Sequence, residues 1–299
     1  QWLQMNITSK PLGPRVEARL WRLPSTPGRS KSTACQPKSQ TGVGVLTMIA
    51  LRTYNRFMIP RIHCPFPLAP GATLELPPEA SHHVAKVLRM GEGDALILFD
   101  GRGGEWRARL HRVGKTTAAV LESFDEVDRE APIPVTLVQG LPAADKMDWI
   151  VQKATELGVA RIRPVVARRS VIRLSGERMA RRAAHWQAVA VAACEQCQRN
   201  RVPEVAPLVD LMDYFAEAPV PSGHRLMLAP GAELRLADLA PPTGPVTLLA
   251  GPEGGFEEDE LAAARLTGFQ AVRLGPRVLR TETAGMAALA AMMALWGDY

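Results

Sequence analysis

Two stretches near the C-terminus combine glycine, proline and charged residues at a spacing that could hold a ligand and act on it. The first, Gly251-Pro-Glu-Gly-Gly255, follows the apolar run Val246–Ala250. The second, Leu274-Gly-Pro-Arg-Val-Leu-Arg-Thr-Glu-Thr-Ala284, begins in another short apolar run. Glycine lets backbone donors and acceptors approach a ligand closely, because no Cβ stands in the way. A tight turn that binds nothing is an equally good interpretation of the glycines alone.

The residues around these loops alternate between strand and helix patterns from 133 to 299. Alternation of this kind predicts an α/β fold with a mostly parallel sheet covered by helices. Loops that follow such strands would meet at the carboxyl edge of the sheet, where open α/β sheets bind ligands. The expected strands are Ile133–Gln139, Arg161–Val166, Arg225–Ala229, Val246–Ala250 and Ala271–Leu274.

The last predicted helix, Thr283–Trp296, is small and apolar on nearly every face. A helix of this composition has to be buried on both sides. Its own domain supplies one side, and a second subunit is the simplest cover for the other. The pattern therefore favours a homodimer.

Residues 58–125 have a different pattern, with one short helix and several strands joined by tight turns. The strands are expected at Ala95–Phe99, Glu105–Arg112 and Thr116–Leu121. Short strands at this spacing suggest a small β-barrel. The charged segment 126–132 that follows is expected to be a linker.

Residues 1–57 carry all of the net positive charge, with nine Lys and Arg against Glu17 alone. The rest of the chain holds 27 basic and 29 acidic residues, so the formal charge of +6 does not by itself indicate nucleic-acid binding. Because this segment has no sustained period, we expect either a disordered extension or translated upstream sequence with Met58 as the natural start. Both interpretations exclude it from the fold.

Several classes of site lack their sequence motifs. The chain has no G-x-G-x-x-G, no phosphate-binding P-loop, no G-x-S-x-G and no H-E-x-x-H, and no acidic or histidine cluster that predicts a metal site. Cys194 and Cys197 fall inside a helix pattern without a second pair at zinc spacing, so two unremarkable thiols are expected. The lack of a disulfide framework fits a reducing cytoplasm. No apolar run approaches the roughly 20 residues that a membrane span needs.

Five stretches occur in the order found in the ribosomal RNA small subunit methyltransferase E family, and the chain resembles that family over residues 58–299. Those enzymes belong to the SPOUT class, the α/β-knot methyltransferases. His82–Met90 also resembles the family's first domain. One such match would be weak, whereas five in order are highly specific. The five stretches are Lys146–Val159, Arg168–Ser170, Glu195–Arg199, Gly251–Phe256 and Leu274–Ala284.

The resemblance implies a fold, an activity and partners. It implies a C-terminal SPOUT trefoil-knot domain over 133–299, preceded by a small PUA-like β-barrel domain over 58–125 that binds RNA. It also implies a homodimer that uses S-adenosylmethionine to methylate N3 of one uridine in small-subunit (16S) ribosomal RNA, within the assembled small subunit. A SPOUT enzyme for another RNA, or a non-catalytic RNA-binding factor of the same fold, stays open as an alternative.

Within that family, the two glycine loops are expected to form the walls of the S-adenosylmethionine site. The cofactor needs backbone donors and acceptors together with an apolar wall. Gln139 is a weaker candidate for the floor. The expected wall residues are Leu249, Ala250, Gly251, Gly254 and Gly255 on one side, and Leu274, Gly275, Val278, Leu279 and Thr283 on the other.

Uridine N3 is a poor nucleophile until its proton leaves, so the implied reaction needs a base or a cation that stabilises the uracil anion. Arg280 suits the anion, because a guanidinium cannot take up a proton. Glu282 would serve as the base only if burial favoured its protonated form, and a local ion pair with Arg280 is the alternative. The resemblance adds Arg199 as a third catalytic candidate, which could instead simply pair with Glu195.

RNA contacts are expected from both domains. His82, His83 and Arg89 would dock RNA if the first domain is PUA-like. Arg168 and Arg169 belong to a basic segment, residues 161–201, that holds ten arginines against two glutamates and suits a phosphate backbone.

Three further residues near these motifs could have either a functional or a purely structural role. Phe256, which follows the glycine loop, either receives an unstacked base or anchors the next helix in the core. Lys146 and Lys153 flank one helix face, and we expect them to meet solvent rather than phosphate.

Overall fold

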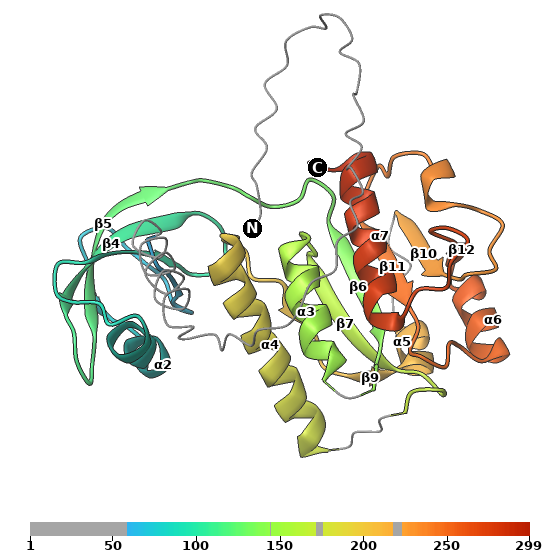
Figure 1. Ribbon diagram of the computed structural model, residues 1–299, viewed down its shortest axis with the longest axis horizontal. Coiled ribbons are helices and arrows are strands. Elements are labelled where there is room, and N and C mark those ends of the chain that lie inside the picture. The colour runs from blue at the N-terminus through green and yellow to red at the C-terminus, as the bar shows by residue number, and fades with distance from the viewer. Residues whose placement is uncertain (1–58, 144, 172–175, 218–222) are drawn as a thin grey trace, which may run out of the picture. The chain divides into compact units, whose positions relative to one another are not determined.

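The computed structural model describes residues 59–143, 145–171, 176–217 and 223–299, shown in Figure 1. All of these residues belong to one unit of the chain, Arg56–Tyr299. The expectations for residues 1–57 lie outside the described residues. None of the described helices is long and apolar enough to cross a membrane.

The first part of the described chain is a five-stranded sheet in the order β1-β3-β4-β5-β2. Its pairs are antiparallel except β1 with β3, which is parallel. Leu96, Leu98 and Leu110 point into one apolar core, and Arg107 and Arg109 point outward. This alternation follows from the two-residue period of a strand. The strands are β1 (Arg61–His63), β2 (Thr73–Glu75), β3 (Ala95–Phe99), β4 (Glu105–Arg112) and β5 (Ala118–Asp125).

The one short helix expected in this part consists of two consecutive turns. The α-helix α2 (Pro78–His82) runs directly into a π-helical turn, η1 (His83–Val87). Val84 of this turn is buried in the same core as the strands.

The second part of the chain is a parallel sheet in the order β12-β10-β11-β6-β7-β8, and β9 also pairs with β7. All five predicted strands exist: Arg161–Val166 and Val246–Ala250 have the predicted bounds, and the ends of the other three differ by one or two residues. Every pair in this sheet is parallel, as the alternation of strands and helices predicts. The strands are β6 (Val135–Gly140), β7 (Arg161–Val166), β8 (Glu204–Val205), β9 (Val209–Asp210), β10 (His224–Leu228), β11 (Val246–Ala250) and β12 (Gln270–Val272).

Both faces of this sheet are buried, as is typical of a parallel sheet covered by helices. Leu137 and Leu248 belong to a core cluster that also holds residues of α3, α4 and α7, whereas Val138 and Leu249 belong to a separate cluster with residues of α5 and α6. Figure 1 shows α3 and α7 in front of the sheet. The helices are α3 (Lys146–Glu156), α4 (Glu177–Cys197), α5 (Leu211–Glu217), η2 (Leu236–Asp238, a 3-10 turn), α6 (Glu258–Leu266) and α7 (Thr281–Trp296).

The last helix returns from the edge of the sheet to its centre. After the edge strand β12, α7 packs beside α3 and over β6 and β11. It begins at Thr281, two residues before the predicted start, because Arg280 has the extended backbone of a cap residue. Leu289 and Met292 are fully buried, while Leu295 on the other face is 47% exposed. The structure therefore confirms that one face of α7 is buried within its own domain. The cover of the other face by a second subunit stays a prediction.

The two thiols of α4 are unremarkable in their surroundings. Cys194 and Cys197 are both free, and burial raises the pKa of Cys194 to about 12. Among the described residues, no three His, Cys, Asp or Glu side chains cluster in a way that could hold a metal ion.

Candidate functional site

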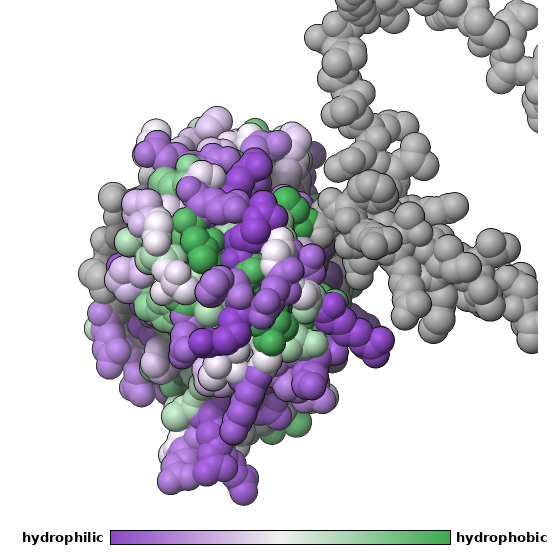
Figure 2. Space-filling model, turned by 90° about the vertical axis from the view of Figure 1, so that its left-hand side faces the viewer, coloured by the Kyte–Doolittle hydropathy of each residue, from purple (hydrophilic) through white to green (hydrophobic). Residues whose placement is uncertain are grey.

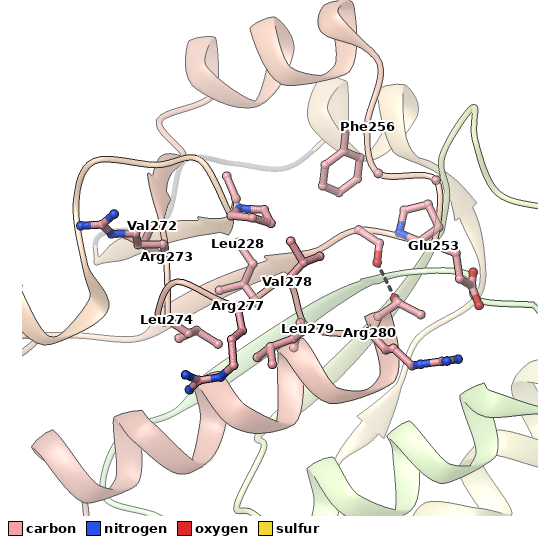
Figure 3. A pocket seen from close by; sticks show the side chains of 18 of the residues that line it. Leu228, Glu253, Phe256, Val272, Arg273, Leu274, Arg277, Val278, Leu279 and Arg280 are labelled. Carbon is pink, nitrogen blue, oxygen red and sulfur yellow. Dashed lines mark hydrogen bonds between the residues drawn. The ribbon is translucent and has the colours of Figure 1, made fainter.

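A pocket of about 640 Å³ lies where β10, β11 and β12 end (Figure 3). The three strands are parallel neighbours, so the loops after them converge at one edge of the sheet. The two glycine loops of the sequence form two of its walls. The predicted wall residues that line it are Gly251, Gly254, Gly255, Leu274, Gly275, Val278 and Leu279.

Three predicted wall residues do not line this pocket. Leu249 is buried in the cluster beneath α5 and α6, and Ala250 is buried in the cluster of α3 and α7. Thr283 is exposed in the first turn of α7. Side chains within a strand point to the two faces of the sheet, where helices cover Leu249 and Ala250, so neither side chain reaches the cavity.

A third wall, after β10, was missed in the sequence. Leu228, Ala229 and Pro230 line the pocket at the end of β10, the strand that lies between β12 and β11. The available signal was Pro230-Gly231, which ends a predicted strand in the same way as Gly251-Pro252. Figure 3 shows Leu228, Val278 and Phe256 around the cavity.

Hydrogen bonds below the pocket tie the start of α7 to the first glycine loop. The Thr281 hydroxyl donates to the carbonyl of Gly251, and the buried Gln139 amide donates to Thr281 Oγ1 at 3.2 Å. Gln139, the expected floor residue, therefore supports Thr281 by a hydrogen bond and does not itself line the pocket. A Cβ on Gly140 would come within 2.6 Å of Pro252, so this glycine lets β6 lie directly against the loop.

Four charged residues form what we call the pocket cluster: Lys146, Glu253, Glu282 and Arg280. The Lys146 ammonium lies 2.9 Å from Glu253 Oε1 and 3.2 Å from Glu282 Oε2. The hydrogen bond that Lys146 donates to Glu253, with a second to Glu282, raises the pKa of Lys146. Burial alone would raise the pKa of Glu253, but hydrogen bonds from Lys146 and from backbone amides hold it below its ordinary value. Lys146, expected to face solvent, thus lines the pocket.

Arg280 lines the pocket as the residue that precedes α7. In Figure 3 it lies on the same side as Glu253, away from Arg273 and Leu274. Among the described residues it has no carboxylate within ion-pairing distance, and Glu282 pairs with Lys146. The alternative of a local Arg280–Glu282 ion pair is therefore not what the structure shows.

Phe256 belongs to the core and also faces the pocket, so its role as a core anchor is confirmed and its contact with an unstacked base stays a prediction. Its ring packs against the cluster beneath α5 and α6, and it also lines the pocket. A Cβ on Gly251 would lie 3.2 Å from that ring, so the glycine brings the aromatic face close to the loop.

Arg199 does not line the pocket. It is 4% exposed, and its guanidinium donates to Glu130 and to the carbonyl oxygens of Thr155 and Val159. The alternative partner, Glu195, instead accepts a hydrogen bond from the backbone N–H of His63 at 2.9 Å. Within one chain, this geometry ties the end of α4 to the end of α3, and a catalytic role for Arg199 stays a prediction without a contact to support it.

The two predicted RNA-binding arginines of the second domain are engaged with the helix α6. Arg168 pairs with Asp259 at 2.5 Å, and Arg169 pairs with Glu257 at 2.8 Å. Arg169 also donates to the carbonyl of Gly254, so it braces the glycine loop from outside the pocket. Both side chains remain exposed, and RNA contact stays a prediction for them.

His82, His83 and Arg89 are exposed on and just after the short helix of the barrel. Figure 2 shows the side of the molecule that carries this helix in Figure 1, where hydrophilic residues predominate between small hydrophobic patches. The surface is open to a polar partner, and the role of these residues in binding RNA stays a prediction.

The comparisons with known proteins cover both parts of the chain. Residues 129–293 match the family model of an RNA methyltransferase domain, and residues 76–122 match that of an RNA methyltransferase PUA domain. Ribosomal RNA small subunit methyltransferase E of Bacillus subtilis is 36% identical over 74% of this chain and 89% of its own length. The enzyme of the same name from Synechocystis is 34% identical over 75% of this chain and 74% of its own length.

A solved structure gives the same answer. The ribosomal RNA small subunit methyltransferase E of Neisseria gonorrhoeae, bound to S-adenosyl methionine, superposes with a TM-score of 0.77. It is 41% identical and covers 81% of this chain and 99% of its own. These matches confirm the expected fold class, a SPOUT α/β-knot domain preceded by a PUA-like barrel. The chain belongs to the ribosomal RNA small subunit methyltransferase E family, a family of RNA methyltransferases.

Proposed function

We propose that this protein binds S-adenosylmethionine in the pocket at the ends of β10, β11 and β12 and methylates N3 of a uridine in small-subunit ribosomal RNA. The observation that carries the proposal is the pocket itself, whose walls are the glycine loops of the family motifs. The similar protein of Neisseria gonorrhoeae was solved with S-adenosyl methionine bound.

The residues present fit this cofactor. A cavity of about 640 Å³ is within the range of small-molecule sites. Leu228, Val278 and Phe256 offer apolar surface, and the glycine loops offer backbone donors and acceptors. When bound, S-adenosylmethionine would supply a positively charged methyl donor. The carboxylate of Glu253, in the first glycine loop, is an anion that lines the same pocket.

The substrate would be held at the pocket cluster. The guanidinium of Arg280 suits the uracil anion, because it donates hydrogen bonds and keeps its charge. Glu282 is the candidate proton acceptor, since it lies in the first turn of α7, two residues after Arg280. Methylation at N3 requires that this proton leave before or during the reaction.

The RNA would approach across both domains. His82, His83 and Arg89 are the proposed contacts on the barrel, and Arg168 and Arg169 those beside the glycine loop. The proposed substrate is the RNA within the assembled small subunit, which places the enzyme in the cytoplasm.

The outer face of α7 is the proposed homodimer contact. Ala287, Ala291 and Leu295 of this helix line a hollow of about 430 Å³, and Arg235, Arg273 and Arg277 line its other side. A small, uncharged helix face of this kind suits close packing against a second copy.

The experiment is incubation of the protein with S-adenosylmethionine and unmodified small ribosomal subunits, followed by analysis of the nucleosides. We expect 3-methyluridine to appear in small-subunit RNA. Methylation of a different nucleoside would favour a SPOUT enzyme for another target. Cofactor binding without any transfer would favour a non-catalytic RNA-binding factor.

A further inference from the structure

Lys146 sits where three separate segments of the chain meet at the pocket. It is the first residue of α3, while Glu253 lies in the middle of the first glycine loop and Glu282 lies in the first turn of α7. The two carboxylates bind the same ammonium at 2.9 and 3.2 Å. Glu253 also accepts a hydrogen bond from the N–H of Ala143, just before α3. One cation therefore joins both glycine-loop walls to a third element.

We propose that Lys146 is a positioning residue for methyl transfer: its ammonium holds the Glu253 and Glu282 carboxylates together and thereby fixes Glu282 and Arg280 against the substrate uridine. This inference rests on the proposed function. It assigns to Lys146 a task that the sequence did not suggest, since a lysine on a helix face ordinarily meets solvent.

The two carboxylates need a cation between them. Because both contact the same nitrogen, their oxygens lie about 6 Å apart at most. Like charges at that separation repel, more strongly where solvent screens them little. Glu282 Oε2 is buried and has no other hydrogen-bond partner within the described ranges. Removal of the Lys146 charge would thus push the first turn of α7 away from the glycine loop.

A movement of that turn would displace Arg280 more than it would open the cofactor walls. Arg280 is the residue immediately before α7, two positions from Glu282. The backbone of the walls has its own connection, because Thr281 donates to the carbonyl of Gly251. Loss of Lys146 should therefore reduce turnover much more than cofactor affinity.

Lys153 is a matched control on the same helix. It also pairs with a glutamate, Glu156, at 2.8 Å, and its side chain is about as exposed as that of Lys146. It does not line the pocket. An exposed ion pair three residues apart on a helix contributes little to stability.

The experiment compares Lys146→Met, Lys146→Arg and Lys153→Met with the unmodified protein. Methionine is an unbranched side chain only one heavy atom shorter than lysine, and it removes the charge. For each protein we would measure kcat and KM on unmodified small subunits, the Kd for S-adenosylmethionine by calorimetry, and amide hydrogen exchange of residues 251–256 and 281–284 without ligand.

We expect Lys146→Met to lower kcat by about 100-fold, because misplacement of a reacting group by about 1 Å has an effect of that size. KM and the cofactor Kd should change by less than about threefold, which is the split that a positioning role predicts. Amide exchange should quicken in both segments. Lys146→Arg should recover about tenfold of the lost rate, since it restores the cation with a different shape. Lys153→Met should match the unmodified protein in every measurement.

Two outcomes would overturn the inference. Either Lys146→Met keeps the kcat of Lys153→Met, or it loses cofactor affinity and kcat in equal proportion, which would make the contact merely structural. If the unmodified protein transfers no methyl group, the proposed function fails. In that case unchanged amide exchange in Lys146→Met would also reject the ammonium as the link between the two segments.

Discussion

Two charged clusters in this protein use the same kinds of side chain in different surroundings. The first, which we call the junction cluster, consists of Arg61, Glu105, Arg129 and Asn200. Glu105 accepts from Arg61 at 2.6 Å, from Arg129 at 2.9 Å and from Asn200 at 3.2 Å. The side chains of Arg61 and Glu105 are only 7% and 10% exposed. These contacts join strands of the barrel to the residues after α4.

The pocket cluster is more open. The side chains of Lys146, Glu253 and Glu282 are 31%, 30% and 21% exposed, and Arg280 faces the cavity without a carboxylate partner among the described residues. The Lys146 ammonium has three N–H donors, of which two carboxylates occupy two. Charged groups with donors left over beside a cavity can bind a ligand, whereas enclosed groups that bind one another hold the fold together. From this difference we propose that the pocket cluster takes part in the chemistry and that the junction cluster stabilises the fold.

The largest expected effect is that of Arg280→Ala. We expect kcat to fall by about 1,000-fold, because a preorganised cation beside a developing anion contributes on that scale. Cofactor affinity should stay within about threefold of the original value, since the glycine loops remain intact. Single-turnover methylation and calorimetry measure the two quantities separately. Equal losses in kcat and in cofactor affinity would show that Arg280 stabilises the pocket structure. The two clusters would then not differ in role.

The junction cluster should show the reverse behaviour. Glu105→Gln removes a charge that two arginines share, so we expect the melting temperature at pH 7 to fall by about 5 °C. The kcat of the folded enzyme should stay within about twofold. A loss of turnover without a loss of stability would contradict the division between the clusters.

The pH dependence of the junction cluster sharpens this prediction. Burial would raise the pKa of Glu105, but hydrogen bonds from Arg129, Arg61 and Asn200 lower it from 4.5 to about 2. A carboxyl with a lowered pKa stabilises the folded state above its unfolded pKa and loses this contribution as the pH falls through the folded value. The difference in melting temperature between the original protein and Glu105→Gln should therefore be constant above about pH 5 and shrink towards pH 2. A difference that grows with acid would show that another group is responsible.

Much of the fold followed from the sequence because strand ends carry local signals. Apolar runs that stop at Gly251-Pro252 and Gly275-Pro276 identified two walls of the pocket. The third wall was missed because it depends on strand order: β10 lies between β12 and β11, which places Pro230 between the two glycine loops at the edge of the sheet. A sequence without an alignment gives the ends of strands but not their neighbours.

The surroundings of two site candidates have a similar cause. Arg199 belongs to a family motif, and its guanidinium is buried against Glu130 and two carbonyl oxygens, so its catalytic role stays a prediction. Lys146, expected to meet solvent, lines the pocket. Both outcomes depend on contacts between residues far apart in the chain, such as Lys146 with Glu253 and Arg199 with Glu130. Helix periodicity shows on which face of a helix a residue lies, but it does not show which other segments of the chain contact that face.

Among the glycines of the pocket, Gly275 is the most informative position for a substitution. Nothing lies within 4 Å of a Cβ built there, and its backbone does not require glycine, so a side chain would enter open space. At Gly254, in contrast, a Cβ would meet Arg169 at 2.7 Å, and a change there would also disturb the loop. Gly114 in the barrel, where a Cβ has only one atom within 4 Å, at 3.9 Å, provides a control away from the pocket.

The most direct test of the account is a calorimetric titration of S-adenosylmethionine into the original protein, Gly275→Val and Gly114→Val. We predict binding by the original protein and by Gly114→Val, and a loss of at least about tenfold in affinity for Gly275→Val at an unchanged melting temperature. Undiminished binding by Gly275→Val, or no binding by the original protein, would contradict the assignment of this pocket to the cofactor.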